Sequence, residues 1–368
     1  MDEKINYSAL LDDQQLEAVK TLDGYVRVVA GAGSGKTRVL TYRYAYLVNQ
    51  GGIDPQEIAC ITFTRDAAQE MKTRIEGLIS QETGSICTFN SMGLKILQPE
   101  MFRLHWDKKF DVKAEDVDLS TVLTKIYRKL KITRSQLSYD NAISAIARIK
   151  NEYVITLQNK DLPFYAEWLD PQAGFDFDRE VKAFQKDGQL ELAVFYAFLK
   201  EQKLGHFIDY TDQVCIPLFL FARYQDVLEK WQHKFSFIMV DEFQDVNPAN
   251  YELCEKLSGH GNLFIVGDPN QMIYSWRGAK SSLFADFHET HPGTTDVFLP
   301  KNRRSLEGIV KAANTIIQYN DNPLFKPMEA VRKSETKVQL LRCETDTDET
   351  DAVANTINKL IRSGVKPK

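Results

Sequence analysis

A small-residue loop near the start of the sequence, AGAGSGKT at residues 30–37, constrains the fold more than any other stretch. A run of β-forming residues, 25–29, precedes the loop, and a helical pattern over residues 37–48 follows it at once. Small residues let successive backbone N–H groups face one point, and the start of a helix adds positive potential there. The alternative, a glycine-rich turn that binds no phosphate, does not explain the Lys-Thr pair that ends the stretch. The sequence therefore predicts a phosphate-binding P-loop between a strand and a helix, with Lys36 on the β- and γ-phosphates and Thr37 on Mg²⁺. The predicted phosphate loop comprises Ala30, Gly31, Ala32, Gly33, Ser34, Gly35, Lys36 and Thr37.

Short apolar runs recur along the chain and alternate with helical segments. They are expected strands at residues 58–63, 86–89, 235–240, 263–266 and 297–299. Strands separated by helices favour a parallel sheet with crossover helices, that is, an α/β fold. Because ligands of such sheets bind at the carboxyl ends of the strands, residues that follow each run are candidate site residues.

Two carboxylates, Asp241 and Glu242, directly follow the six-residue apolar run at 235–240. In a chain with a P-loop, this arrangement predicts that Asp241 holds Mg²⁺ through water and that Glu242 activates the attacking water. Gln271 follows the next expected strand and is a candidate sensor of the γ-phosphate. Gln15 lies in an expected helix at residues 7–20, and its amide could read an adenine edge.

Aromatic residues follow several of the expected strands. Tyr274, Trp276 and Arg277 form a cluster with the composition of a stacking platform for unpaired bases, although Trp276 alone could fill a core. Two further pairs are Phe63-Thr64 and Phe89-Asn90, which would lie at strand ends. Core packing is the alternative for both phenylalanines.

Residues 111–205 have helical rather than strand-like periodicity and predict a helical insertion into the α/β domain. The apolar stripe that includes Val122, Ile126 and Leu130 has a basic opposite face, which could follow phosphates or could simply be solvated. Beyond residue 300, the pattern predicts a helix at 309–319, a strand at 338–341 and a helix at 350–363.

The bulk composition sets further bounds. The 368 residues suffice for two or three domains, and the net charge of −5 does not exclude nucleic acid, because a local groove can still be basic. The five cysteines show no metal-binding spacing, and no apolar run is long enough to cross a membrane. We therefore expect a cytoplasmic protein without a membrane partner.

Taken together, the motifs resemble the N-terminal part of superfamily 1 DNA helicases of the UvrD/PcrA/Rep type. The stretches that carry the resemblance are LDDQQLEAV (11–19), AGAGSGKT (30–37), ITFTRDAAQEMKTRI (61–75), CTFNSMG (87–93), DEFQDVN (241–247), VGDPNQMIYSWRGA (266–279) and NRRS (302–305). The resemblance implies a RecA-like P-loop NTPase domain at 1–110 and 206–300. It also implies a helical insertion domain at 111–205 and a partial second α/β lobe at 301–368.

The resemblance also implies roles for single residues. It implies that Gln15 reads adenine, that Arg38 and Arg74 line the nucleotide cleft, and that Arg304 is an arginine finger. It implies that Gln271 couples the γ-phosphate to DNA. The aromatic residues that it implies to stack on single-stranded DNA are Phe63, Tyr274 and Trp276. The expected activity is ATP- and Mg²⁺-dependent 3′–5′ unwinding, on single-stranded DNA and single-strand/duplex junctions.

The sequence departs from the family pattern at several positions. Asn90 stands where the family often has His, Asp66 where it often has Lys, Arg303 where a Tyr stacks on adenine, and Asn250 where Gln is frequent. The family's later motifs do not occur. From this we expect an incomplete motor that binds nucleotide and DNA weakly and does not unwind. Two alternatives are a helicase-like subunit with a repair or nuclease partner and an ATP-gated DNA-binding module.

Overall fold

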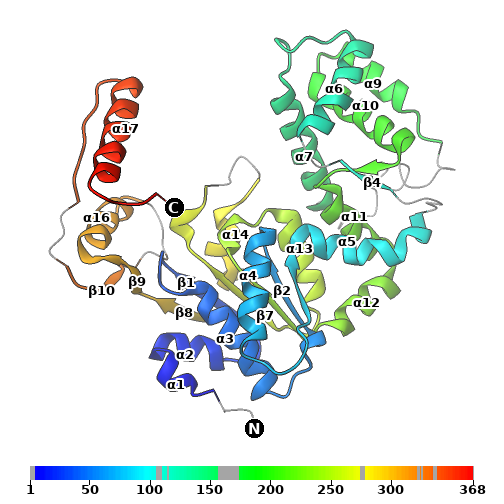
Figure 1. Cartoon of the computed structure of the whole chain (residues 1–368). Helices are drawn as coiled ribbons and strands as arrows, with labels where there is room; N and C mark the ends of the chain where they lie inside the picture. The colour runs from blue at the N-terminus through cyan, green and yellow to red at the C-terminus, as the bar shows by residue number, and fades with distance from the viewer. Residues whose placement is uncertain are drawn as a thin grey trace.

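The computed structural model describes residues 5–104, 110–113, 116–155, 174–273, 278–320, 324, 326–334 and 338–367. A six-stranded sheet with the order β3-β2-β6-β7-β1-β8 forms its centre (Figure 1). The strands are β1 (Tyr25–Ala30), β2 (Ile58–Thr62), β3 (Ser85–Thr88), β6 (Phe237–Val240), β7 (Leu263–Gly267) and β8 (Thr295–Leu299). Every neighbouring pair in this sheet is parallel, so the predicted α/β fold with a parallel sheet is confirmed.

Both faces of the sheet are covered by helices. Ile58 and Cys60 of β2 belong to a core shared with α2 (Asp13–Lys20), α3 (Lys36–Asn49) and α4 (Arg65–Glu76). The intervening Ala59 and Ile61 belong to the opposite core, shared with α5 (Phe89–Glu100), α11 (Asp212–Arg223) and α13 (Pro248–Leu257). Strands buried on both faces have continuous apolar sequences, which is why the sequence predicted them.

Further helices complete the sheet domain. They are α1 (Tyr7–Leu10), η1 (Pro55–Glu57), η2 (Met101–Leu104), α12 (Gln225–Lys234), η4 (Phe243–Asp245), η5 (Pro269–Gln271), α14 (Ser281–Ala285) and α15 (Phe287–Thr290). The single helix expected at residues 7–20 is two helices. Asp12 interrupts it because its side chain caps α2 in a capping box with Gln15.

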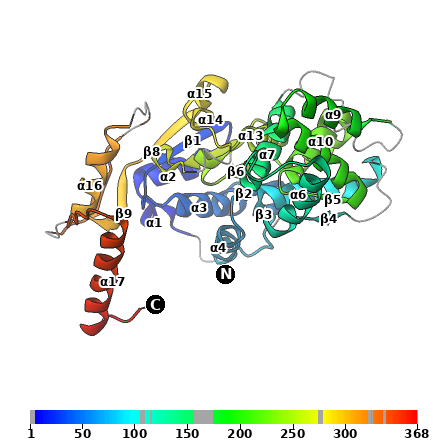
Figure 2. The same cartoon turned by 90° about the horizontal axis from the view of Figure 1, so that it is seen from above.

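A helical unit is inserted between α5 and α11, as predicted, and lies to one side of the sheet in both views (Figures 1 and 2). Its helices are α6 (Asp116–Leu130), α7 (Tyr139–Ile155), α9 (Phe177–Lys186) and α10 (Leu190–Gly205). Two short paired strands, β4 (Asp111–Val112) and β5 (Phe207–Ile208), lie where the chain enters and leaves this unit. The predicted apolar stripe of α6 is buried. On its basic face, Lys125 pairs with Glu201 at 2.6 Å. Arg134, in the turn that follows α6, lies over the ring of Tyr139, so these two cations have partners within the protein.

Lys150 of α7 is buried where the helical unit meets the sheet domain. Its Nζ donates to Asp212 Oδ2 of α11 at 2.8 Å, to Asp209 Oδ2 at 2.7 Å and to Gln202 Oε1 of α10 at 3.0 Å. All four side chains are buried. This ionic cluster joins two helices of the insertion to a helix that packs on the sheet.

A smaller unit follows β8. It contains β9 (Lys301–Leu306) paired in parallel with β10 (Glu329–Arg332), and the helices α16 (Glu307–Ile317) and α17 (Asp346–Arg362). The strand predicted at Val338–Leu341 is wrong, because this stretch is irregular and Leu340 is 95% exposed. Strand propensity reflects packing against a neighbour, and β10 takes that place beside β9. Among the described helices, none is both long and apolar enough to cross a bilayer.

Candidate nucleotide-binding site

The loop between β1 and α3 has the backbone of a phosphate-binding nest. Gly33 and Gly35 have φ of +68° and +95°, values in the left-handed region that favours glycine. Ser34 is buried, and its N–H and hydroxyl both donate to Gly31 O, at 3.2 and 2.7 Å. Lys36 opens α3, so the loop leads directly into a helix N-terminus, where backbone N–H groups favour anions.

Gln15 lies against this loop. It is 1% exposed, and its Nε2 donates to Ser34 O at 3.0 Å. A Cβ on Gly35 would come within 2.8 Å of the same nitrogen, so Gly35 leaves room for the contact. The guanidinium of Arg303 pairs with Asp12, whose side chain caps the helix of Gln15. Arg303 is therefore held beside the loop by an ion pair.

The acid pair lies at the carboxyl end of β6 and faces the P-loop lysine. Lys36 Nζ is 3.3 Å from Glu242 Oε2. Asp241 is 4% exposed, and burial, with the negative charge of Glu242, raises its pKa to about 7. Glu242 has a left-handed φ of +49°, a strained backbone of the kind found at functional sites.

Gln244 connects the acid pair to the end of β7, a connection that the sequence analysis missed. It is 2% exposed, its Nε2 donates to Glu242 Oε2 at 2.9 Å, and its Oε1 accepts from Asp268 N at 2.9 Å. Asp268 Oδ2 in turn accepts from Gln271 Nε2 at 2.6 Å. A continuous network of contacts thus runs across the strand ends and joins Lys36, Glu242, Gln244, Asp268 and Gln271.

A carboxamide between two acids was the available signal for Gln244. Its position in DEFQD, four residues after the last residue of the strand, is visible in the sequence. An amide both donates and accepts, so it can bond a carboxylate on one side and an N–H on the other. Only the fold shows that the N–H belongs to Asp268, 24 residues further on.

The three predicted cleft arginines lie in different surroundings. Arg38 donates to Leu10 O at 2.8 Å and covers the ring of Tyr42. Arg74 pairs with Glu70 one turn earlier on the exposed side of α4. Arg304 is exposed, yet its Cβ approaches the P-loop so closely that a Cβ on Gly33 would be 2.7 Å from it. The side chain of Arg38 also begins near the loop, because a Cβ on Gly35 would be 3.6 Å from Arg38 Cβ, but Arg304 approaches the loop from the second unit.

The predicted DNA-contacting residues differ in how far their side chains are exposed to solvent. Phe63 is half-buried at the end of β2, with its ring centroid 5.2 Å from that of Phe89. Phe89 is 2% exposed and has the core position that the sequence left open as its alternative. Thr64 is exposed and caps α4, and the Asn90 amide donates to Tyr210 O at 2.9 Å. Tyr274, Trp276 and Arg277 lie outside the described residues.

The donor set fits a nucleotide-bound magnesium ion. In the described part of the chain, no three His, Cys, Asp or Glu side chains gather into a set that could hold a metal. Mg²⁺ usually keeps several waters and takes one or two protein oxygens together with phosphate oxygens. The Asp241 carboxyl and the Thr37 hydroxyl satisfy this requirement, and the raised pKa of Asp241 marks a buried carboxylate that a cation would stabilise.

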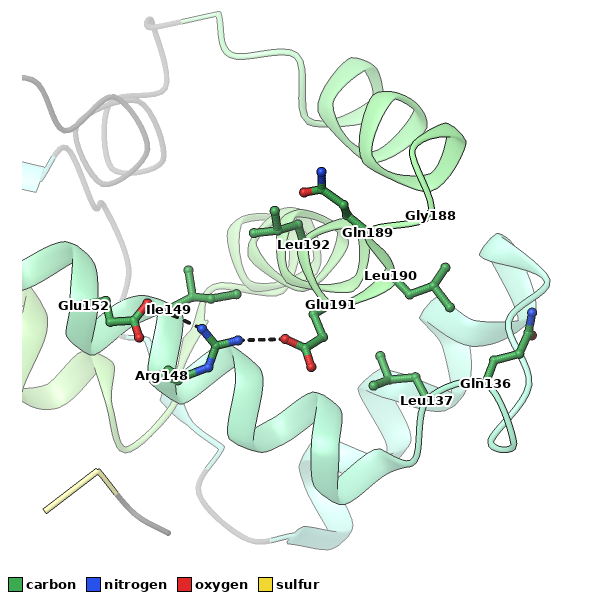
Figure 3. A pocket seen from close by; sticks show the side chains of 10 residues that line it. All are labelled: Gln136, Leu137, Arg148, Ile149, Glu152, Gly188, Gln189, Leu190, Glu191 and Leu192. Carbon is green, nitrogen blue, oxygen red and sulfur yellow. Dashed lines mark hydrogen bonds and ion pairs between the residues drawn. The ribbon is translucent and has the colours of Figure 1, made fainter. Parts of the chain in front are cut away.

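A groove of about 720 Å³ lies elsewhere, on the helical unit (Figure 3). Arg148 of α7 projects into it and pairs with Glu191 at 2.7 Å and with Glu152 at 3.5 Å. Its apolar lining comes from Leu137 and Ile149 and from Leu190 and Leu192 at the start of α10. No lining residue belongs to the phosphate loop or to the acid pair, so we do not assign the nucleotide to this groove.

A P-loop after the first strand of a parallel sheet, facing an acid pair after another strand, defines a P-loop NTPase with a RecA-like lobe. Residues 11–292 match the model of the UvrD/REP helicase N-terminal domain, and the chain belongs to this family.

Curated relatives agree with this assignment. The chain is 34% identical to the ATP-dependent DNA helicase PcrA of Staphylococcus epidermidis over 97% of its own length and 46% of the relative. It is 33% identical to the PcrA helicase of Staphylococcus aureus over the same shares. The chain therefore spans about half the length of the curated relatives that it matches.

Proposed function

We propose that this chain is the ATP-binding portion of an ATP-dependent 3′–5′ DNA helicase. The observation that supports this most directly is the network from Lys36 through Glu242, Gln244 and Asp268 to Gln271. It connects the phosphate-binding lysine to the loop that precedes the predicted DNA-stacking residues. A motor needs such a connection, because ATP hydrolysis must change how the protein holds DNA.

In this proposal, the P-loop backbone holds the phosphates and Lys36 contacts the β- and γ-phosphates. Thr37 and Asp241 hold Mg²⁺, which when bound neutralises charge on the phosphate oxygens. Glu242 accepts the proton of the attacking water, and its contact with Lys36 keeps it at the phosphate end of the site. Gln15 lies on the side where the base would enter, and Arg303 offers a planar guanidinium in place of the family's tyrosine.

The second unit supplies charge from the other side of the cleft. Arg304 begins at the P-loop and is exposed, so its guanidinium is free to reach the γ-phosphate as an arginine finger. We propose residues 1–110 and 206–300 as the RecA-like domain, 111–205 as the insertion domain and 301–368 as the start of the second RecA-like domain. Arg38 and Arg74 remain candidates for the cleft, but each must first leave its present partner.

Single-stranded DNA, and junctions with a duplex, are the proposed partners. The half-buried Phe63 offers an aromatic edge beside the exposed Thr64, and Tyr274, Trp276 and Arg277 would extend it. For the 368-residue chain itself we expect weak nucleotide and DNA binding, slow hydrolysis and no unwinding. The reason is that ratcheting needs two complete lobes, and the described second unit holds one strand pair and two helices.

Binding assays with separate probes test this proposal. A fluorescent ATP analogue with Mg²⁺ and a fluorescent oligo-dT are titrated against the wild type, Lys36→Ala and Trp276→Ala. We expect Lys36→Ala to lose nucleotide binding but keep DNA binding, and Trp276→Ala to show the reverse. Glu242→Gln should bind the analogue normally and lose hydrolysis. Equal binding by all the proteins, or unwinding by the wild-type chain, would contradict the proposal.

A further inference from the structure

Three consecutive carbonyl groups of the P-loop accept hydrogen bonds from outside the loop. Ala32 O, Gly33 O and Ser34 O accept, in that order, from Asn302 Nδ2 at 2.7 Å, Arg303 N at 2.9 Å and Gln15 Nε2 at 3.0 Å. The loop peptides are trans, so each N–H points away from the carbonyl of the same peptide. The partners of Ala32 O and Ser34 O therefore turn the N–H groups of Gly33 and Gly35 toward the inner side of the loop, where a phosphate would bind, while the N–H of Ser34 donates within the loop to Gly31 O.

Asn302 makes the shorter of two side-chain contacts from the second unit to this loop, 2.7 Å to Ala32 O against 3.5 Å from Arg303 Nη1 to Ser34 O. It is 3% exposed, and both ends of its carboxamide are bonded. While Nδ2 holds Ala32 O, Oδ1 accepts from Arg304 N at 3.0 Å and from Ser305 N at 2.8 Å. One side chain thus hydrogen-bonds both the phosphate loop and the backbone of the predicted arginine finger, and so fixes the position of one relative to the other.

The contact is tight as well as polar. A Cβ on Gly33 would lie 3.1 Å from Asn302 Oδ1 and 2.7 Å from Arg304 Cβ. Glycine at this position therefore serves the approach of β9 in addition to the left-handed backbone of the nest.

We propose that Asn302 is a positioning residue for nucleotide binding, which pre-orients the P-loop through Ala32 O and registers Arg304 against it. This inference rests on the proposed function that the P-loop binds ATP. Because pre-orientation acts before the ligand arrives, its effect on the loop is measurable without nucleotide.

Two variants separate the two ends of the carboxamide. Asn302→Ala removes both. Asn302→Asp keeps an oxygen for the Arg304 and Ser305 N–H groups but replaces the donor to Ala32 O with an acceptor. The matched control is Asn262→Ala at the amino ends of the central strands, away from the carboxyl ends that carry the site. Asn262 there bonds Ser236 O at 3.1 Å and Gly24 N at 2.9 Å.

The experiment measures hydrogen exchange of peptides covering residues 31–37 in nucleotide-free protein, followed by the Kd for the Mg²⁺–ATP analogue. We expect both Asn302 variants to exchange faster and to bind about 10-fold more weakly, a loss of about 1.4 kcal/mol and the scale of one hydrogen bond. Asn262→Ala should change neither. Exchange without nucleotide is free of any repulsion between a new aspartate and phosphate, so it isolates the lost donor.

Either of two results would overturn the inference. Asn302→Ala could exchange and bind like the wild type, or Asn302→Asp could match the wild type while Asn302→Ala is impaired, which would leave only a turn role. A wild type that binds no nucleotide would instead refute the proposed function, while the exchange comparison would still test the contact with Ala32 O.

Discussion

Lys150→Met tests whether the buried ionic cluster holds the helical unit to the sheet domain. The substitution keeps an unbranched apolar side chain of similar length, with a thioether sulfur in place of one methylene, and removes the ammonium group. Three hydrogen bonds are lost, and the carboxylates of Asp209 and Asp212 remain buried without their cation. Removing one partner of a buried ion pair typically costs about 3–5 kcal/mol, and we expect a loss of unfolding free energy in this range.

The loss should depend on pH. Burial, with the negative charge of Asp212, already raises the pKa of Asp209 to about 6 in spite of Lys150, and removing Lys150 raises it further. A carboxyl whose pKa is higher in the folded state stabilises the protein fully below its unfolded pKa of about 3.9 and loses that contribution as the pH rises through the folded value. The penalty is therefore largest above about pH 7 and shrinks toward about pH 5, where a proton partly replaces the lost cation.

Urea unfolding followed by circular dichroism measures the effect, and each transition is fitted separately because a chain with several units can unfold in steps. Lys125→Met is the control. Lys125 also pairs with a carboxylate, Glu201 at 2.6 Å, but its side chain is 70% exposed. A surface pair contributes about 0–1 kcal/mol. If Lys150→Met cost no more than Lys125→Met at about pH 8, the cluster would not have the structural role that we derive from its burial.

Two further substitutions test the site. Gln244→Glu places a carboxylate oxygen against Glu242, so we expect the kcat for ATP hydrolysis to fall about 10-fold or more. The control, Gln225→Glu, changes an exposed glutamine and should leave kcat unchanged. A normal kcat for Gln244→Glu would show that the contact between Gln244 and Glu242 does not matter for hydrolysis. Gly33 and Gly24 both have a left-handed φ, of +68° and +84°, but a Cβ on Gly33 would lie 2.7 Å from Arg304 Cβ, whereas a Cβ on Gly24 would meet no atom within 4 Å. We therefore expect Gly33→Ala to weaken nucleotide binding more than Gly24→Ala does. Equal nucleotide affinity in both alanine variants would show that the close approach to β9 is unimportant.

The sequence was sufficient for the sheet and for the residues at its strand ends. The P-loop depends on local backbone chemistry, and the strand before Asp241 is apolar throughout because both of its faces are buried. Both signals lie within a few neighbouring residues. The strand predicted at Val338–Leu341 failed because an apolar run identifies a strand only where a neighbouring strand is present.

The contacts that organise the site were beyond a local interpretation of the sequence. Asn302 bonds Ala32 across 270 positions, and Lys150 meets Asp212 across 62. The residue type alone does not predict such a partner, since most Asn and Lys side chains are solvated. Gly267 is a partial exception. A Cβ there would lie 2.7 Å from Gln244 Oε1. A glycine at this position therefore indicates that another group approaches closely, but the sequence does not show that the group is Gln244.

The P-loop is therefore held from two sides by different parts of the chain. On one side, Lys36 contacts Glu242, and the network continues through Gln244 toward Gln271. On the other side, Asn302 holds the carbonyl of Ala32. Any movement of β9 relative to the sheet must either break the bond to Ala32 or move the loop with it. Because β9 begins only two residues after β8, such movement bends a short connection, and the change reaches the phosphate site directly, without passing through the hydrophobic core.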